Sequence, residues 1–179
     1  MRATGVVRRI DDLGRIVIPK EIRRTMRMRE GDPLEIFTGQ AGEIVLKKYS
    51  IMAELSQFSQ GYADALYKVS GLSCVICDND QVVAFSGNGK KEAIGMGIAK
   101  EAEDIIAGRL SYFKQFPGEK VIYTHSRATV PAVGITPIIS GGDAVGIVGL
   151  LSEEGQILSD AQKKLLVLTA LYLATNLDG

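Results

Sequence analysis

The spacing of apolar and polar residues divides the chain into two parts near residue 50. In the first part, two short runs rich in β-branched residues, 6–10 and 15–18, flank the sequence Asp11-Asp12-Leu13-Gly14. Runs of this kind around a tight turn predict a β-hairpin. Pro19 follows, and it suits the first turn of a helix because its missing N–H would have no partner there. We therefore expect a helix of roughly two to three turns, ended by Gly31-Asp32-Pro33.

A second alternating pattern follows that short helix. Residues 34–37 and 43–47 alternate across a turn that contains Gly39 and Gly42, which predicts a second hairpin. About fifty residues arranged in this way bury too little apolar surface to be stable alone, and this segment has no cysteine for a disulfide. We therefore expect two copies of residues 1–50 to intertwine their hairpins into one barrel-like core.

The second part of the chain begins and ends with a helical pattern. Apolar residues recur every three or four positions in 51–69 and again in 157–176, which predicts two amphipathic helices. Neither run is long enough for a sustained coiled coil, so we expect the two helices to pack together as a short bundle.

An alternation of strands and one helix is predicted between those two helices. Turns as short as Asn79-Asp80 join neighbouring strands, so the strands run antiparallel. The fold class is therefore α+β, with a first domain at 1–50 and a second at 51–179 in which helix 51–69 is the connector. The expected strands are 74–78, 82–86, 112–116, 121–124, 132–139 and 144–151, and the expected helix is 91–107.

Charge is distributed unevenly along a chain whose formal net charge is zero. Residues 1–50 hold eleven Lys or Arg against seven Asp or Glu, a net charge of +4, and the remainder carries −4. Attraction to phosphate depends on charge within a Debye length of ~8–10 Å, so the basic first part suggests a DNA footprint. The candidate contacts are Arg8, Arg9, Arg15, Lys20, Arg23 and Arg24.

Arginine suits this role because its planar fork binds a guanine edge or a phosphate through two hydrogen bonds. The alternative is that these residues are solvated surface charges, as most charge runs are. A dimer would double the cluster, and few acidic residues compensate it between Arg2 and Arg29. We therefore favour contact with double-stranded DNA.

The sequence TGVVRRIDDLGRIVIPKEIRRTMRMREGDPLEIF closely resembles the swapped-hairpin DNA-binding domain of the AbrB-like transition-state regulators. The resemblance implies an intertwined dimer and sequence-selective regulation of sporulation genes, by activation or repression. In that family the DNA-contacting arginines lie on the first strand, after the first turn and on the short helix. These positions correspond to Arg8, Arg15, Arg23 and Arg24, with Arg9 and Lys20 as further candidates.

Two segments of the second part, CDNDQVVAFSGNGKK and PIISGGDAVGIVGLLS, resemble a GAF-type sensor domain. That resemblance implies a domain that senses a small-molecule effector or supplies oligomerisation, without naming the ligand. The helices 51–69 and 157–176 are expected to join two dimers into a homotetramer with two DNA-binding units, which raises affinity through effective concentration.

Other signals in the sequence are discounted. Cys74 and Cys77 have the spacing of a metal or redox pair, but residues three apart on a strand point to opposite faces. His125 is the only histidine, so no multi-histidine site is expected. The glycines of 87–91 do not match a phosphate-binding loop, although this segment is the best candidate for contact with an acidic effector. Gly95-Met96-Gly97 falls inside the expected helix, so it predicts no dinucleotide site.

We therefore expect no enzyme, no metal and no cofactor. One alternative is an antitoxin, because swapped-hairpin domains also serve in proteins that bind a toxin; the other is an enzyme acting on a nucleotide. The N-terminus lacks a signal-peptide pattern, and the most apolar stretch, 165–174, is about half of the ~20 residues that span a bilayer. A cytoplasmic protein without membrane contact is expected.

Overall fold

The computed structural model describes residues 5–40, 42–49, 56–88, 93–125 and 130–177. The chain divides into two compact units, Met1–Tyr49 and Ser50–Gly179. Each is considered by itself.

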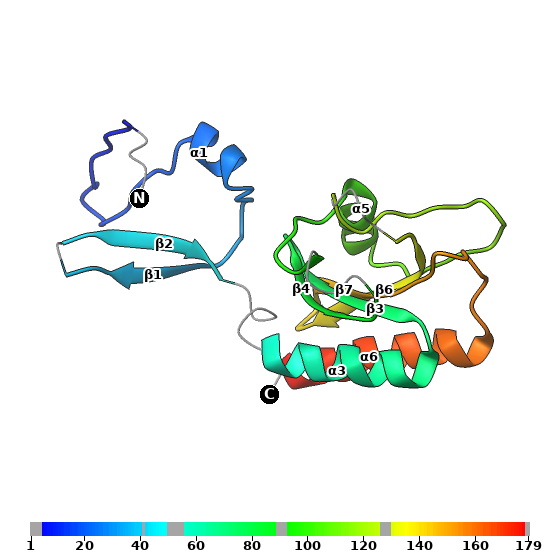
Figure 1. Cartoon of the computed structure of the whole chain (residues 1–179). Helices are drawn as coiled ribbons and strands as arrows, with labels where there is room; N and C mark the ends of the chain where they lie inside the picture. Colours follow the sequence, from blue (N-terminus) through cyan, green and yellow to red (C-terminus); the bar gives the residue numbers. More distant parts are fainter. Residues whose placement is uncertain (1–4, 41, 50–55, 89–92, 126–129, 178–179) are drawn as a thin grey trace. The chain divides into compact units, whose positions relative to one another are not determined.

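The N-terminal unit contains one short helix and one β-hairpin (Figure 1). Helix α1 spans Lys20–Thr25, and the strands β1 (Leu34–Thr38) and β2 (Ile44–Lys48) pair antiparallel with Ile36 opposite Leu46. The second hairpin predicted from the sequence is therefore present. Helix α1 is shorter than expected and ends well before Gly31, because Arg27 adopts a left-handed backbone conformation with φ 51°.

The first predicted hairpin forms only its turn. The N–H of Gly14 bonds to the carbonyl of Asp11 at 3.0 Å, and the N–H of Asp11 bonds to the carbonyl of Arg15 at 3.1 Å. The flanking runs, 5–10 and 15–18, are not strands among the described residues, so the single chain contains the predicted turn without the predicted strand pairing. A β-branched run favours extended backbone, but a strand also needs a neighbour that completes its hydrogen-bond ladder.

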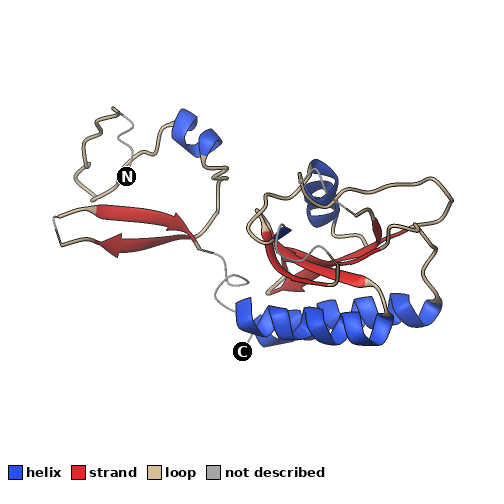
Figure 2. Cartoon of the chain, in the orientation of Figure 1, coloured by secondary structure: helices blue, strands red, loops and turns tan. Residues whose placement is uncertain are grey.

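The C-terminal unit is a five-stranded antiparallel sheet in the order β4-β3-β7-β6-β5. Helices α3 and α6 lie together against one face and α5 lies on the other, as Figure 1 shows and Figure 2 repeats by element type. The fold is therefore α+β, as predicted. The strands are β3 (Ser73–Asp78), β4 (Val82–Ser86), β5 (Tyr112–Phe113), β6 (Ala132–Ser140) and β7 (Asp143–Leu151), and the helices are α3 (Ser56–Ser70), α5 (Lys100–Gly108) and α6 (Asp160–Leu177).

Two apolar cores lie on opposite faces of this sheet. Between the sheet and the pair α3–α6, Ile76, Leu150 and Leu166 are fully buried. Close packing requires a glycine on β6, because a Cβ atom at Gly134 would lie 2.5 Å from Cδ1 of Leu158. On the α5 face, the second core includes Ile135.

Part of the secondary structure between β4 and β6 differs from the sequence prediction. The expected helix 91–107 is interrupted at residues 94–99, where Gly95 has φ 81° and Gly97 bridges to Gln81, and α5 begins at Lys100. The expected strand 112–116 is reduced to two residues. The expected strand 121–124 contributes only single bridges from Val121 and Thr124.

The edge strand β4 is covered by a side chain. The amide of Gln60, on α3, donates from Nε2 to the carbonyl of Phe85 at 2.9 Å, and its Oε1 accepts the N–H of Phe85 at 3.4 Å. The amide thus occupies the backbone groups that another strand would use.

Candidate nucleic-acid interface

All six predicted DNA contacts are exposed and lie in the N-terminal unit. Three flank or precede the first turn and three belong to α1. No shared cavity or cluster brings all of them together within one chain. The structure places Arg8 and Arg9 before the turn, Arg15 directly after it, and Lys20, Arg23 and Arg24 on the helix.

The turn before Arg15 is closed by the carboxylate of Asp11. Its Oδ1 accepts the N–H of Leu13 at 3.0 Å and the N–H of Arg15 at 2.7 Å, while Oδ2 lies 2.7 Å from Nε of Arg15. The backbone N–H of Arg15, followed by its guanidinium, holds the pKa of Asp11 below its ordinary value. The side chain of Arg15 is nevertheless 70% exposed, so it remains accessible to a ligand.

Helix α1 presents Arg23 and Arg24 in its last turn, where positive charge is favourable because the helix dipole is negative there. Pro19 precedes the helix, is buried, and accepts the N–H of Arg23 at 3.0 Å. Beyond the helix, the N–H of Met28 returns to the carbonyl of Arg23 at 2.7 Å. The two arginines therefore stand on a short helix whose two ends are fixed by the backbone.

A lysine on β2 ties the hairpin to the loop after α1. The ammonium of Lys48 donates to the carbonyl of Arg27 at 3.0 Å and lies 3.1 Å from Oδ2 of Asp32. Asp32 also accepts the N–H of Arg29 at 2.7 Å. Sequence reasoning missed both this link and the role of Asp11, because it counted acidic residues only as compensating charge.

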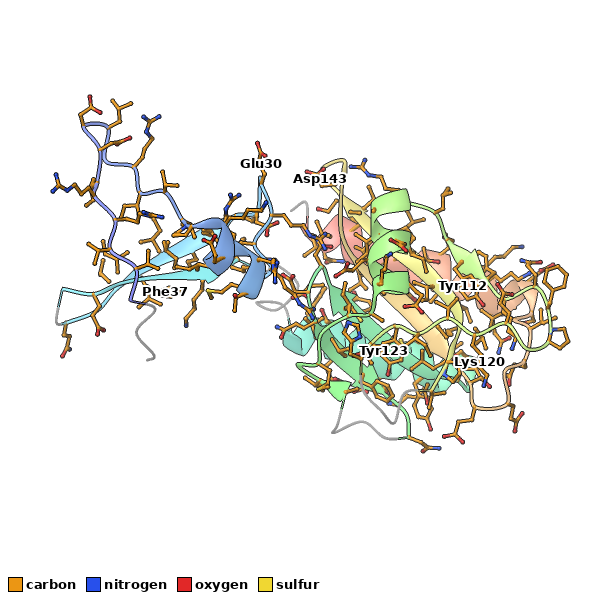
Figure 3. All side chains as sticks on the ribbon, turned by 90° about the horizontal axis from the view of Figure 1, so that it is seen from above. Glu30, Phe37, Tyr112, Lys120, Tyr123 and Asp143 are labelled. Carbon is orange, nitrogen blue, oxygen red and sulfur yellow. The ribbon has the colours of Figure 1, made fainter. Side chains whose placement is uncertain are left out.

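The N-terminal unit buries very little of its apolar surface. Among its described residues only Pro19 is buried, while Val7 is 87% exposed and Val17 is 74% exposed. Figure 3 labels Phe37 on the β1–β2 hairpin, where the ammonium of Lys47 lies 4.6 Å from the centre of its ring. A mainly apolar cavity of about 400 Å³ also opens in this unit, lined by Val17, Ile18, Arg23, Met28, Arg29, Glu30, Asp32 and Leu34.

The two cysteines lie in different cores. Cys74 packs on the face covered by α3 and α6, and Cys77 packs on the α5 face. Both thiols are free and buried, and burial raises their pKa values strongly. Opposite faces of a sheet prevent them from holding one metal ion, and the described residues contain no group of three or more His, Cys, Asp or Glu that could do so.

The remaining predicted signals lie outside any assembled site. His125 is exposed and follows the single bridge at Thr124. In the segment 87–91, Gly87 packs against the side chain of Ser73, and residues 89–91 fall outside the described part of the chain. No helix in that part is both long and apolar enough to cross a membrane.

Comparisons with known proteins find likenesses for both units. The family profile described as "Stage V sporulation protein T C-terminal, transcription factor" matches residues 54–178. The profile "Antidote-toxin recognition MazE, bacterial antitoxin" matches residues 7–52. Stage V sporulation protein T of Bacillus subtilis (strain 168) is 42% identical over 178 residues, 99% of this chain and 99% of that protein.

Two further likenesses concern one unit each. The transition state regulatory protein AbrB of Bacillus subtilis (strain 168) is 53% identical over 49 residues, which are 27% of this chain and 50% of that protein. The GAF domain of a phosphoenolpyruvate-protein phosphotransferase from Coxiella burnetii has a TM-score of 0.51 at 20% identity, and covers 68% of this chain and 80% of that one. This second likeness shows the fold alone.

Proposed function

Because this chain belongs to the stage V sporulation protein T family of transcription factors, we propose that it controls sporulation genes as a homo-oligomer that selects its DNA sites through residues 1–50. It is a sporulation transcription regulator with an AbrB-like N-terminal domain and a GAF-like C-terminal domain. The proposed contacts to double-stranded DNA are Arg8, Arg9, Arg15, Lys20, Arg23 and Arg24.

The observation that carries the proposal is the unburied apolar surface of the N-terminal unit. Val7 and Val17 are largely exposed, and a mainly apolar cavity lies beside α1. A second copy that inserts its first hairpin would cover these side chains and give residues 5–10 and 15–18 a strand to pair with. The same dimer brings two sets of arginines together, which doubles the positive charge offered to a duplex.

The outer face of α3 and α6 supports assembly of two such dimers. Leu168, Leu171 and Tyr172 recur at helical spacing on α6 and are exposed. The ring of Tyr172 lies 5.3 Å from that of Tyr62 on α3, so the apolar surface continues across both helices. Packing this surface against its copy gives a four-helix bundle and a homotetramer with two DNA-binding units.

We propose that the C-terminal unit, residues 51–179, senses a small-molecule effector or serves in oligomerisation, and that the protein acts in the cytoplasm without catalysing a reaction. The GAF-like fold supports the sensor role by analogy of fold. Turnover assays with nucleoside triphosphates test the absence of catalysis: release of product by purified protein would contradict it.

Substitution of the helix arginines tests the proposed interface. Genome-wide mapping of bound DNA first supplies an operator fragment, and fluorescence anisotropy then measures its affinity. We expect Arg23→Ala and Arg24→Ala each to weaken operator binding by about fivefold to a hundredfold, because each removes a charged fork worth ~1–3 kcal/mol.

Lys68→Ala is the matched control, since it removes one exposed charge from α3 in the other unit. Its operator affinity should stay within about twofold of the wild type, because Lys68 lies outside residues 1–50, the proposed DNA-binding segment. Wild-type affinity in both arginine variants, with circular dichroism showing an intact fold, would remove α1 from the interface.

The antitoxin alternative has one supporting observation, the profile match over residues 7–52. Antitoxin tails that wrap a toxin are typically disordered, whereas residues beyond Ser56 form a sheet with two cores. A far-UV circular dichroism spectrum of residues 51–179 alone separates the two: a folded spectrum supports the regulator, and a disordered one supports the antitoxin.

A further inference from the structure

The carboxylate of Asp11 has two functions in the turn between the first two runs of the N-terminal unit. Its Oδ1 accepts the N–H groups of Leu13 and Arg15, which closes the turn. Its Oδ2 accepts the Nε–H of Arg15 at 2.7 Å. The same side chain therefore fixes both the backbone and the guanidinium of Arg15.

The geometry of this pair leaves the functional edge of Arg15 accessible. A guanidinium has N–H donors on Nε and on both terminal nitrogens, and the bond to Asp11 uses the one on Nε. The two Nη groups form the edge that a phosphate or a guanine accepts in a bidentate contact. The side chain is 70% exposed, so this edge can reach a duplex.

Charge alone makes Asp11 unfavourable at this position. A carboxylate within a few ångströms of an arginine that contacts DNA repels the phosphates and reduces the local positive potential. Any benefit of Asp11 must therefore come from holding the side chain of Arg15 in one conformation. An arginine side chain with several rotatable bonds loses conformational freedom when it binds, and holding it in one orientation beforehand reduces that loss.

We propose that Asp11 is a positioning residue for DNA recognition: it holds the guanidinium of Arg15 in the orientation that distinguishes one DNA sequence from another. The inference rests on the proposed function, in which Arg15 contacts DNA. It predicts that Asp11 contributes to discrimination between sequences while it lowers attraction to DNA in general. A group that acted only through its charge would change binding to all DNA alike.

The neighbouring Asp12 offers a matched control. It is exposed, lies in the same turn, and takes no part in the bonds described for Asp11. Asp11→Asn and Asp12→Asn each remove one negative charge. In Asp11→Asn the amide oxygen still accepts the two backbone N–H groups, but the amide N–H₂ group faces Nε of Arg15 as a second donor and releases the guanidinium.

The measured quantity is the ratio of affinities for the operator fragment and for unrelated DNA of equal length. Anisotropy titrations of the full-length protein at two salt concentrations give both affinities. We expect Asp11→Asn to lower this ratio by about fivefold or more, the discrimination carried by one bidentate contact, with equal or tighter binding to unrelated DNA. Asp12→Asn should leave the ratio unchanged, because both affinities rise together.

A double-mutant cycle separates positioning from a purely structural effect. In the Arg15→Ala background, Asp11→Asn should cause no further loss of discrimination, because the side chain that it positions is gone. A loss that persists there would place the effect in the turn and overturn the proposal. So would an Asp11→Asn protein whose ratio matches that of Asp12→Asn.

The Arg15→Ala and Asp11→Asn variants together separate the role of Asp11 from that of Arg15. If Arg15→Ala lowers the ratio and Asp11→Asn does not, Arg15 remains a DNA contact and Asp11 loses its positioning role. If Arg15→Ala itself leaves operator and unrelated DNA affinities unchanged, both the contact and the positioning role are refuted.

Discussion

At the scale of single residues, the two thiols illustrate how burial determines reactivity. Cys74 and Cys77 are on one strand, yet each lies in a different core and both are free. Desolvation is the largest cause of the raised pKa of each thiol, because the thiolate is poorly solvated inside an apolar core. The thiolate is the reactive form, so neither cysteine is suited to redox chemistry or metal binding in the folded protein.

A labelling experiment tests this conclusion. In native protein at pH 8, a thiol reagent such as Ellman's reagent should react with neither cysteine on the timescale on which free cysteine reacts completely. Addition of a denaturant should make both react rapidly. Fast labelling of one thiol in the native protein would show that its core opens more readily than the packing implies.

Contacts between individual residues were also the least predictable feature from the sequence. The six basic candidates were identified by their charge, and the structure finds them exposed. The contacts that hold them were not predictable in the same way. Lys48 reaches Arg27 across twenty-one residues of sequence, and no periodicity reports such a contact. Asp11 lies only four residues from Arg15, and an Asx-type turn could have been suspected from Asp-Asp-Leu-Gly.

At the scale of elements, prediction succeeded where one pattern dominated. Strands β3, β4, β6 and β7 and the second hairpin were found close to their predicted bounds, because their alternation or continuous apolar character is unambiguous. The helix predicted at 91–107 is present over 100–107 but interrupted at 94–99, because glycines at 95 and 97 favour a turn over helix propagation. The first hairpin lacks strands because local sequence specifies extended backbone but not its partner.

The packing of α6 against β6 gives a testable consequence at this scale. A methyl group at position 134 would lie 2.5 Å from Leu158, 3.2 Å from Leu166 and 3.3 Å from Phe113. We expect Gly134→Ala to destabilise the C-terminal unit by about 1–3 kcal/mol through overpacking. The free energy of unfolding is measured from the chemical denaturation transition of that unit.

Gly61, in the middle of α3, is the matched control, because a Cβ atom there would meet nothing within 4 Å. Gly61→Ala should stabilise the protein by about 0.5–1 kcal/mol, since alanine loses less backbone entropy in a helix. Equal and small effects of the two substitutions would contradict the tight contact at position 134.

At the scale of the whole molecule, the proposed assembly depends on two apolar surfaces in separate units. The N-terminal surface would form the dimer, and the outer face of α3 and α6 would join two dimers. These surfaces are independent, so each can be disrupted while the other remains. Leu171 is 61% exposed on α6, which makes it a suitable place for a charge that does not disturb the core.

We expect Leu171→Glu to convert a tetramer into a dimer, because burial of a carboxylate at the bundle interface costs several kcal/mol. Sedimentation equilibrium measures the mass directly. Operator binding to a single site should persist, whereas the gain from two linked sites should disappear. A variant that remains tetrameric would place the contact between dimers elsewhere.

The amide of Gln60, on α3, bonds to the backbone of Phe85 on the edge strand β4. An open sheet has two edge strands. A strand from another chain could pair with either edge and begin a growing fibre. At β4 the amide of Gln60 bonds the backbone of Phe85, and residues 95 and 96 bond the backbone of Val82. The other edge is the two-residue β5. These contacts hinder strand addition at β4, and β5 offers only a short template. We therefore expect concentrated protein not to grow into fibres through this sheet.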